Sequence, residues 1–210
     1  MQLQFERFQN KYSYLNGNKN MSIRRIDLCR HTMQVGYKNK ISFTSASLYK
    51  HFELFFMVMA NVDYINGELK LKNAYFDLDQ SEKVCVSYQL GQGLTKSVAE
   101  KYFNIPWVAH VKTMKNMNYQ FISGGNKKII IDPNQNNGIE PDLIGFDRRC
   151  NAHLFESKGS SSPNMTNKTV QKAINQVSNY IYFIDPSGGS KLLQHVVPVF
   201  LIFLLVLMGG

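Results

Sequence analysis

Two short apolar segments joined by a polar turn constrain this sequence more than any other feature. LIGF occupies residues 143–146, AHLF occupies residues 152–155, and the intervening DRRCN is typical of a turn between antiparallel strands. Because both segments are apolar on both faces, we expect the hairpin to lie centrally in a sheet. Asp142 precedes the first strand, and Glu156 and Lys158 end the second, so the hairpin is predicted to bring all three to one edge.

The charged residues at this edge have the chemistry of a metal site. Side chains alternate along a strand, so Glu156 and Lys158 project from the same face, and the register puts Asp142 beside them. Ionised groups at the margin of a core are costly unless they are paired or bound to a cation. Two carboxylates suit Mg²⁺ (or Mn²⁺), which keeps several waters and accepts phosphate as a co-ligand. The lysine can orient or deprotonate an attacking water, as metal-assisted phosphodiester hydrolysis requires.

A simpler interpretation makes the same residues structural. Glu156 and Lys158 can form a same-face ion pair worth about 0.5 kcal/mol. Asp142 can be a turn residue after Pro141. The upstream Pro-Asp, the hairpin spacing and Gly159 after the lysine together favour a functional site.

The Pro-Asp pair that ends at Asp142, followed by E-S-K from Glu156 to Lys158, resembles the motif of the PD-(D/E)XK nuclease superfamily. The resemblance covers about residues 91–205. It implies an α/β fold with a restriction-endonuclease-like core: a helix, three antiparallel-connected strands, a second helix and a final strand. It also implies that Asp142 and Glu156 bind the metal and that Lys158 is catalytic.

The same resemblance suggests further residues for the site. Members of the superfamily often add a carboxylate, and the candidates are Glu100 in the preceding helix and Glu140 beside the motif. Many members also place a glutamine or a lysine on the helix after the motif. Lys172 and Gln176 lie four residues apart on one polar face there, although a solvated helix face explains them as well.

The chain divides into a basic, largely helical region at residues 1–90 and the nuclease-like core at residues 91–210. In the first region, residues 45–65 favour a buried helix and the following NGE marks a turn. In the second, GQG at residues 91–93 favours a turn before a helix capped by Thr95 and lacks the residues of a phosphate-binding loop. The remaining predicted elements are strands at residues 119–123 and 127–132 and a helix ending near residue 181.

The C-terminal segment VVPVFLIFLLVLM, residues 196–208, is apolar throughout. A continuous apolar run is typical of a buried strand, and a membrane-spanning helix needs roughly 20 residues. We therefore expect the final strand of the core here, with a membrane anchor as the alternative.

Basic residues concentrate in the N-terminal region. The chain carries a formal charge of +9, and its first 43 residues hold eight basic side chains against two acidic ones, which is +6 of that total. Such a segment favours a polyanionic partner and can neutralise nucleic-acid phosphates without reading bases, whereas an inert basic surface is the alternative. The eight basic residues are Arg7, Lys11, Lys19, Arg24, Arg25, Arg30, Lys38 and Lys40.

The cysteines and the N-terminus indicate the cellular compartment. Cys29, Cys85 and Cys150 are scattered, without the spacing of a disulfide scaffold or a zinc site. The N-terminus has polar and charged residues where an export signal needs an apolar region. We therefore expect reduced thiols in a cytoplasmic protein.

These features predict a Mg²⁺-dependent endonuclease that hydrolyses DNA, with a restriction-like, mobile-element or repair role. Cutting both strands of a duplex usually needs two active sites, which makes a homodimer a hypothesis. Two alternatives stay open. One is a catalytically inactive nucleic-acid-binding module on the same fold, and the other is a membrane-tethered protein held by residues 196–208.

Overall fold

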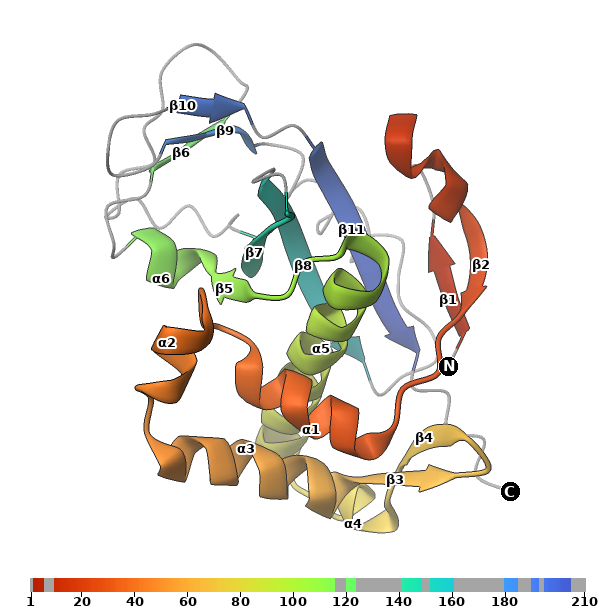
Figure 1. The fold of residues 1–210 in the computed structure, drawn as a ribbon. Coiled ribbons are helices and arrows are strands. Elements are labelled where there is room, and N and C mark those ends of the chain that lie inside the picture. The colour runs from red at the N-terminus through yellow and green to blue at the C-terminus, as the bar shows by residue number, and fades with distance from the viewer. Residues whose placement is uncertain are drawn as a thin grey trace.

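The computed structural model shows a mixed α/β protein built around a four-stranded sheet (Figure 1). The structure describes residues 2–5, 10–115, 120–123, 141–148, 152–160, 180–184, 190–192 and 195–204. The strands of the main sheet are β5 (Val108–His110), β7 (Leu143–Phe146), β8 (Ala152–Ser160) and β11 (His195–Leu204). Their order across the sheet is β11-β8-β7-β5. β7 pairs antiparallel with both β5 and β8, which confirms the hairpin predicted for β7 and β8.

The C-terminal apolar segment forms β11, at the edge of this sheet (Figure 1). β11 runs parallel to β8, with His195 aligned to His153 and Leu204 aligned to Ser160. The strand predicted in the apolar run is therefore confirmed for residues 195–204. In the part of the chain that the structure describes, no helix has both the length and the apolar character needed to cross a membrane.

One long helix, α5 (Gln80–Phe103), runs along the main sheet. It begins after Asp79, whose carboxylate accepts backbone N–H groups of the first turn in a capping box. It ends at Asn104, which has a left-handed φ of 56°. Near that end, the ring centroids of Phe103 and Phe155 lie 6.0 Å apart. The helix therefore packs on the face of the sheet that carries Phe155.

The prediction of a turn at residues 91–93 and a helix start at Thr95 is wrong. All of these residues lie inside α5, in a part of the helix that is buried. A Cβ on Gly93 would lie 2.2 Å from Thr32 Oγ1 of helix α1 (Arg25–Gln34). The glycine permits a close crossing of two helices, and packing on both sides of α5 outweighs the poor helix propensity of glycine.

The other N-terminal elements are short helices and two hairpins (Figure 1). Helix α3 lies within residues 45–65 and confirms that a helix forms there, but the prediction that it is buried is wrong for one side, where Phe52 and Phe56 are exposed. Asn66 and Gly67 turn the chain between β3 and β4 with φ values of 55° and 83°, as the Asn-Gly sequence favours. The bounds are β1 Gln2–Phe5, η1 Asn10–Leu15, β2 Gly17–Asn20, α2 Lys40–Thr44, α3 Leu48–Asn61, β3 Val62–Ile65, β4 Glu68–Leu71 and α4 Asn73–Phe76.

A second, three-stranded sheet has the order β10-β9-β6. Its strands are β6 (Gln120–Ser123), β9 (Tyr180–Ile184) and β10 (Ser190–Leu192), and the short helix α6 (Val111–Lys115) precedes β6. β6 confirms the strand predicted at residues 119–123. β9 shows that the helix predicted to end near residue 181 is wrong at that end, because the aromatic and β-branched YIYFI favours a strand. Residues 127–132 and 161–179 lie outside the described residues.

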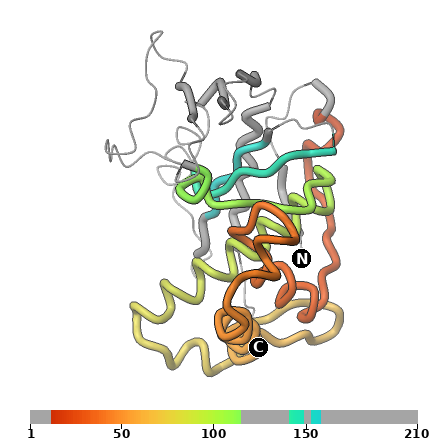
Figure 2. The backbone as a smooth tube through the Cα atoms, turned by 60° about the vertical axis from the view of Figure 1, so that its left-hand side comes forward, coloured from red at the N-terminus to blue at the C-terminus, as the bar shows by residue number. Residues whose placement is uncertain are grey.

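One cluster of buried side chains joins the first ninety residues to the main sheet. It includes Leu28 of α1, Leu94 of α5, and Leu143 and Phe155 of β7 and β8. The predicted boundary after residue 90 falls inside α5, so this helix belongs to both regions. Figure 2 shows α3 and the strands β7 and β8 toward opposite ends of the molecule, with α5 running between them.

Candidate active site at the β7–β8 margin

The register of β7 and β8 places the two predicted metal ligands opposite each other. Leu143 pairs with Phe155, and Ile144 pairs with Leu154. One step beyond the first of these pairs, Asp142 on one chain segment faces Glu156 on the other. The prediction that the hairpin brings these carboxylates together is confirmed.

Each of the two carboxylates accepts a hydrogen bond from the backbone of the opposite segment. The N–H of Asp142 donates to Glu156 Oε2 at 3.1 Å, and the N–H of Ser157 donates to Asp142 Oδ2 at 3.0 Å. Glu156 is only 1% exposed, and Asp142 is half-buried. Backbone donors favour the ionised carboxylate and offset part of its desolvation, but two like charges at this separation repel each other. A cation bound between them would relieve that repulsion.

His110 of β5 borders the same site, and sequence reasoning missed it. It pairs with Leu143, and the N–H of the next residue, Val111, donates to the carbonyl oxygen of Asp142 at 3.1 Å. Burial lowers the pKa of His110, and the nearby charge of Asp142 opposes that change. Nothing local in the sequence connects these residues, because β5 and β7 meet only through sheet pairing.

Gly36 makes room for this imidazole ring. It has a φ of +91°, which side chains rarely adopt, and its N–H donates to the carbonyl oxygen of Val108 at 2.9 Å. A Cβ at Gly36 would lie 2.7 Å from Cδ2 and 2.8 Å from Nε2 of His110. The connection between α1 and α2 is therefore packed directly against the edge of the site.

Helix α5 carries Tyr88 and Gln92. Burial raises the pKa of Tyr88, and the negative charges of Asp142 and Glu156 raise it further. Gln92 lies one helical turn beyond Tyr88, is fully buried, and has no hydrogen-bond partner for either amide atom among the described residues. A buried polar group without a partner costs about 1–3 kcal/mol. Because the sequence GQG suggested a turn, sequence reasoning did not single out Gln92.

The structure does not describe the side chains of four other predicted site residues. The backbone of Lys158 lies in β8 opposite Ile202 of β11, while its side chain is outside the described part of the structure. The remaining candidates lie outside the described residues altogether; they are Glu140, Lys172 and Gln176. The strand β8 extends unbroken through Ser160, as the same-face prediction for Glu156 and Lys158 requires.

Glu100 lies on α5 but takes part in a different cluster. Its Oε1 accepts a hydrogen bond from Arg30 Nη2 at 3.0 Å, and its Oε2 accepts one from the fully buried Lys96. Burial alone would raise the pKa of Glu100, but the bonds from Arg30 and Lys96 outweigh it and hold this pKa at about 2. The structure therefore brings Asp142 and Glu156 together and places Glu100 against α1 instead.

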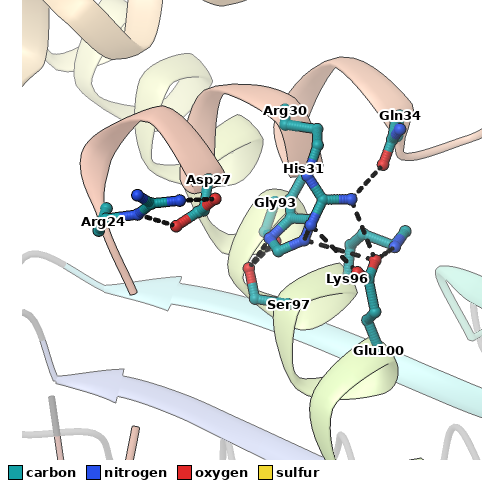
Figure 3. A network of polar contacts seen from close by, with 9 residues as sticks. All are labelled: Arg24, Asp27, Arg30, His31, Gln34, Gly93, Lys96, Ser97 and Glu100. Carbon is teal, nitrogen blue, oxygen red and sulfur yellow. Dashed lines mark hydrogen bonds and ion pairs between the residues drawn. The ribbon is translucent and has the colours of Figure 1, made fainter. Parts of the chain in front are cut away.

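The cluster around Glu100 is a polar network between α1 and α5 (Figure 3). Ser97 Oγ donates to the carbonyl oxygen of Gly93 at 2.9 Å, so His31 Nδ1 donates to Ser97 Oγ, at 2.5 Å. The other ring nitrogen, Nε2, then accepts from Arg30 Nη2 at 2.6 Å. Burial and the charges of Lys96 and Arg30 lower the pKa of His31 to about 4, which keeps the ring neutral at pH 7.

This network contains a serine, a histidine and a glutamate in contact, but it is not arranged for nucleophilic catalysis. Ser97 is 3% exposed, and its proton is donated to a backbone carbonyl inside the helix. His31 Nε2 is occupied by an arginine. The network therefore holds α1 against α5.

Ion pairs neutralise much of the basic N-terminal segment. Arg24 pairs with Asp27 at 2.8 Å, and Arg25 pairs with Asp63 at 2.9 Å. Arg30, as described, pairs with Glu100.

Three lysines of the segment form no ion pair within the described residues: Lys19, Lys38 and Lys40. Lys38 and Lys40 are exposed and follow Gly36, which bridges to Ala109 of β5. These two lysines therefore stand near the same edge of the sheet as His110.

The donor set at the margin fits a hard divalent cation. Asp142 and Glu156 offer carboxylate oxygens held in place by backbone hydrogen bonds. Mg²⁺ is commonly held by one or two carboxylates together with waters and phosphate oxygens, so two protein ligands suffice. Among the described residues there is no group of three or more His, Cys, Asp or Glu side chains that could hold a metal.

Comparison with known proteins adds no relative. No protein-family model matches the chain, and neither a curated protein nor a solved structure matches it.

Proposed function

We propose that this chain is a Mg²⁺-dependent nuclease of the PD-(D/E)XK type that hydrolyses phosphodiester bonds in DNA. The observation that carries the proposal is the pair Asp142 and Glu156, held side by side by reciprocal backbone hydrogen bonds at the margin of a buried hairpin. The element order supports it as well. A helix precedes three antiparallel-connected strands, and a final strand, β11, lies parallel to β8, as in the core that the motif implies.

Each residue of the site has a separate role in the proposed reaction. Asp142 and Glu156 would hold Mg²⁺, which would supply a water of lowered pKa and neutralise charge on the phosphate. The N–H groups of Asp142 and Ser157 keep the carboxylates oriented. Lys158, two residues after Glu156 in β8, is assigned the role of positioning or deprotonating the attacking water. His110 borders the site on the β5 side, where it pairs with Leu143.

Exposed lysines beside the site fit a polyanionic substrate. Lys38 and Lys40 follow Gly36, whose backbone contacts β5 next to His110. We assign them contacts to DNA phosphates, which give salt-sensitive affinity and no sequence information. The arginines of the basic segment are less suited to this role, because three of them already pair with carboxylates of the same chain.

The test is cleavage of supercoiled plasmid, linear duplex, single-stranded DNA and RNA by the full chain, with Mg²⁺ or Mn²⁺ against EDTA. We expect metal-dependent cutting of DNA that is lost in Asp142→Asn, Glu156→Gln and Lys158→Met. The control is Glu53→Gln, which removes an exposed carboxylate of α3 that pairs only with Lys50 among the described residues. Circular dichroism checks that each variant is folded.

Two results would contradict the proposal. One is a folded wild-type protein that cuts no nucleic acid under any metal condition. If that protein still bound DNA in EDTA, the chain would be a binding module on the same fold. The other is cutting that survives in all three site variants, which would place the activity elsewhere.

A further inference from the structure

Helix α3 buries one face and exposes an apolar one. Leu54 and Val58 are buried, and Val58 belongs to the core cluster. Another face of the helix carries four large apolar side chains that are exposed, and their spacing of three or four residues keeps them on one side. These four, here called the α3 stripe, are Leu48 (66% exposed), Tyr49 (79%), Phe52 (51%) and Phe56 (61%).

The α3 stripe is continuous along the helix. The rings of Phe52 and Phe56 are stacked, with their centroids 6.1 Å apart. Single exposed apolar side chains are common on soluble proteins, whereas a contiguous exposed patch marks a surface for interaction. Removing such a patch from water is favourable, so we expect it to be covered by a partner with an apolar surface.

The charges on α3 distinguish between kinds of partner. The helix contains one lysine and one glutamate, so its formal charge is zero in a chain of +9. These two residues, Lys50 and Glu53, pair with each other at 2.9 Å. DNA and anionic membranes attract clusters of lysine and arginine, which this helix does not have. The α3 stripe therefore suits an apolar and uncharged protein surface.

The α3 stripe is complementary to a second copy of itself. Consider a two-fold axis that passes between two antiparallel copies of α3, at right angles to both and at the level of Phe52. Phe52 then faces its own copy, and Leu48 lies level with Phe56 of the other copy. Lys50 lies within about 1.5 Å, one residue along the helix, of the level of Glu53 of the other copy. The same two-fold operation thus matches apolar side chains with each other and opposite charges with each other.

We infer that the α3 stripe is the interface of a symmetric homodimer, in which a second copy of this chain packs its own stripe antiparallel on the first. Aromatic side chains at the centre and charged side chains at the rim are usual in protein interfaces. Figure 2 shows α3 and the strands β7 and β8 toward opposite ends of the molecule, so the two β7–β8 margins lie far apart in this dimer. The dimer does not depend on the proposed nuclease activity.

Sedimentation equilibrium of the full chain over a concentration series tests the dimer. The variants are Phe52→Ser and Phe56→Ser, and the matched control is Tyr14→Ser, at an aromatic residue of η1 that is 63% exposed. Circular dichroism checks that each variant is folded. We expect the wild type and the control to dimerise equally. Each stripe variant should dimerise about 1,000-fold more weakly, because losing a central aromatic residue commonly costs about 30-fold and the symmetry applies the loss twice.

A second experiment tests the antiparallel arrangement through the charged rim. Lys50→Glu leaves two acids on each copy, and Glu53→Lys leaves two lysines. Each variant alone should dimerise about 10-fold more weakly than the wild type, because like charges then face each other. An equimolar mixture of the two should form mixed dimers, because opposite charges face each other again. Neutral changes at these positions remove only a rim contact and leave the stripe and the main sheet intact.

Three results would overturn the inference. A wild type that is monomeric at every concentration would leave the α3 stripe for a different protein. A dimer that neither phenylalanine variant weakens would lie on another surface. A mixture of the two charge variants that associates no better than each variant alone would contradict the antiparallel arrangement. If neither phenylalanine variant folds, the charge variants decide, since their substitutions are on the surface. None of these results bears on DNA cleavage, which is tested separately.

Discussion

Helix α5 borders two polar regions of opposite character. On the side facing α1, each buried charge meets an opposite one: Lys96 bonds to Glu100, and Arg30 bonds to the same carboxylate (Figure 3). At the β7–β8 margin, two carboxylates lie together, and each accepts a hydrogen bond from a backbone N–H of the opposite segment. The first arrangement is self-sufficient and stabilises the fold. In the second, two carboxylates lie on neighbouring segments, which is the arrangement from which we propose a metal site.

The largest expected effect is the loss of DNA cleavage when one carboxylate of the β7–β8 margin is removed. Comparing this loss with the change in melting temperature distinguishes a functional carboxylate pair from a structural one. We expect Asp142→Asn to lower DNA cleavage by about 1,000-fold, or about 4 kcal/mol in activation free energy. The same change should leave the melting temperature in EDTA unchanged or higher, because it removes one of two repelling charges. Plasmid cleavage and calorimetry measure the two quantities. A marked loss of stability would show that the carboxylate pair is structural.

The α1–α5 network should respond in the opposite way. Glu100→Gln leaves Lys96 charged and buried, so we expect it to lower the free energy of unfolding by about 3 kcal/mol. Lys96→Met should cost about 1 kcal/mol or less, because Arg30 still neutralises Glu100 and methionine packs well in its place. Urea unfolding of both variants tests this asymmetry. Equal losses would show that the network does not depend on which charge is removed.

Acid should weaken the network through His31. Its pKa is 6.5 when unfolded and about 4 in the folded protein, so protons bind more tightly to the unfolded chain. Stability is therefore complete above pH 6.5 and is lost as the pH falls toward 4, by about 2.5 kcal/mol between about pH 7.5 and 4.5.

The charged groups around this ring are Arg30, Lys96, Glu100 and Asp27. Glu100, with a pKa of about 2, adds a further loss only below its unfolded value of 4.5. Comparing the pH dependence of unfolding in the wild type and in His31→Gln isolates the contribution of the ring. An identical slope between pH 6.5 and 4.5 in the two proteins would contradict the assignment.

The smallest effect concerns DNA affinity beside the site. Lys38→Ala and Lys40→Ala should each reduce the slope of log affinity against log salt by about one, uniformly across DNA sequences. Lys50→Ala is the matched control, because Lys50 is also exposed but pairs with Glu53 on α3. Fluorescence anisotropy over a salt series measures the slopes. If all three lysines behaved alike, the edge near β5 would have no special role in DNA contact.

Several parts of the fold and of the site could be predicted because they depend on neighbouring residues. The alternation of apolar side chains and a short turn were enough to pair Leu143 with Phe155 and so to set Asp142 beside Glu156. The apolar C-terminal segment was likewise predicted as a strand. In both cases the pattern repeats within one strand or one hairpin, where register alone decides which side chains meet.

Other parts could not be predicted because they depend on contacts between distant segments. Gly91 and Gly93 favour a turn locally, yet they lie inside α5 because the helix is packed on both sides there. The aromatic strand β9 pairs with β6, and no local pattern indicated that pairing. The ion pairs of Arg25 and Arg30 are equally non-local, so the basic segment looked more available to DNA than it is.

The sequence by itself determined the hairpin, its register and the acidic pair at its margin, since strand alternation and a short turn act over a few residues. Only the tertiary structure decided what surrounds that pair. It placed His110 of β5 beside Asp142, and it turned Glu100 toward α1. The physical reason is that these neighbours are brought in by sheet pairing and helix packing, which act between residues far apart in the chain.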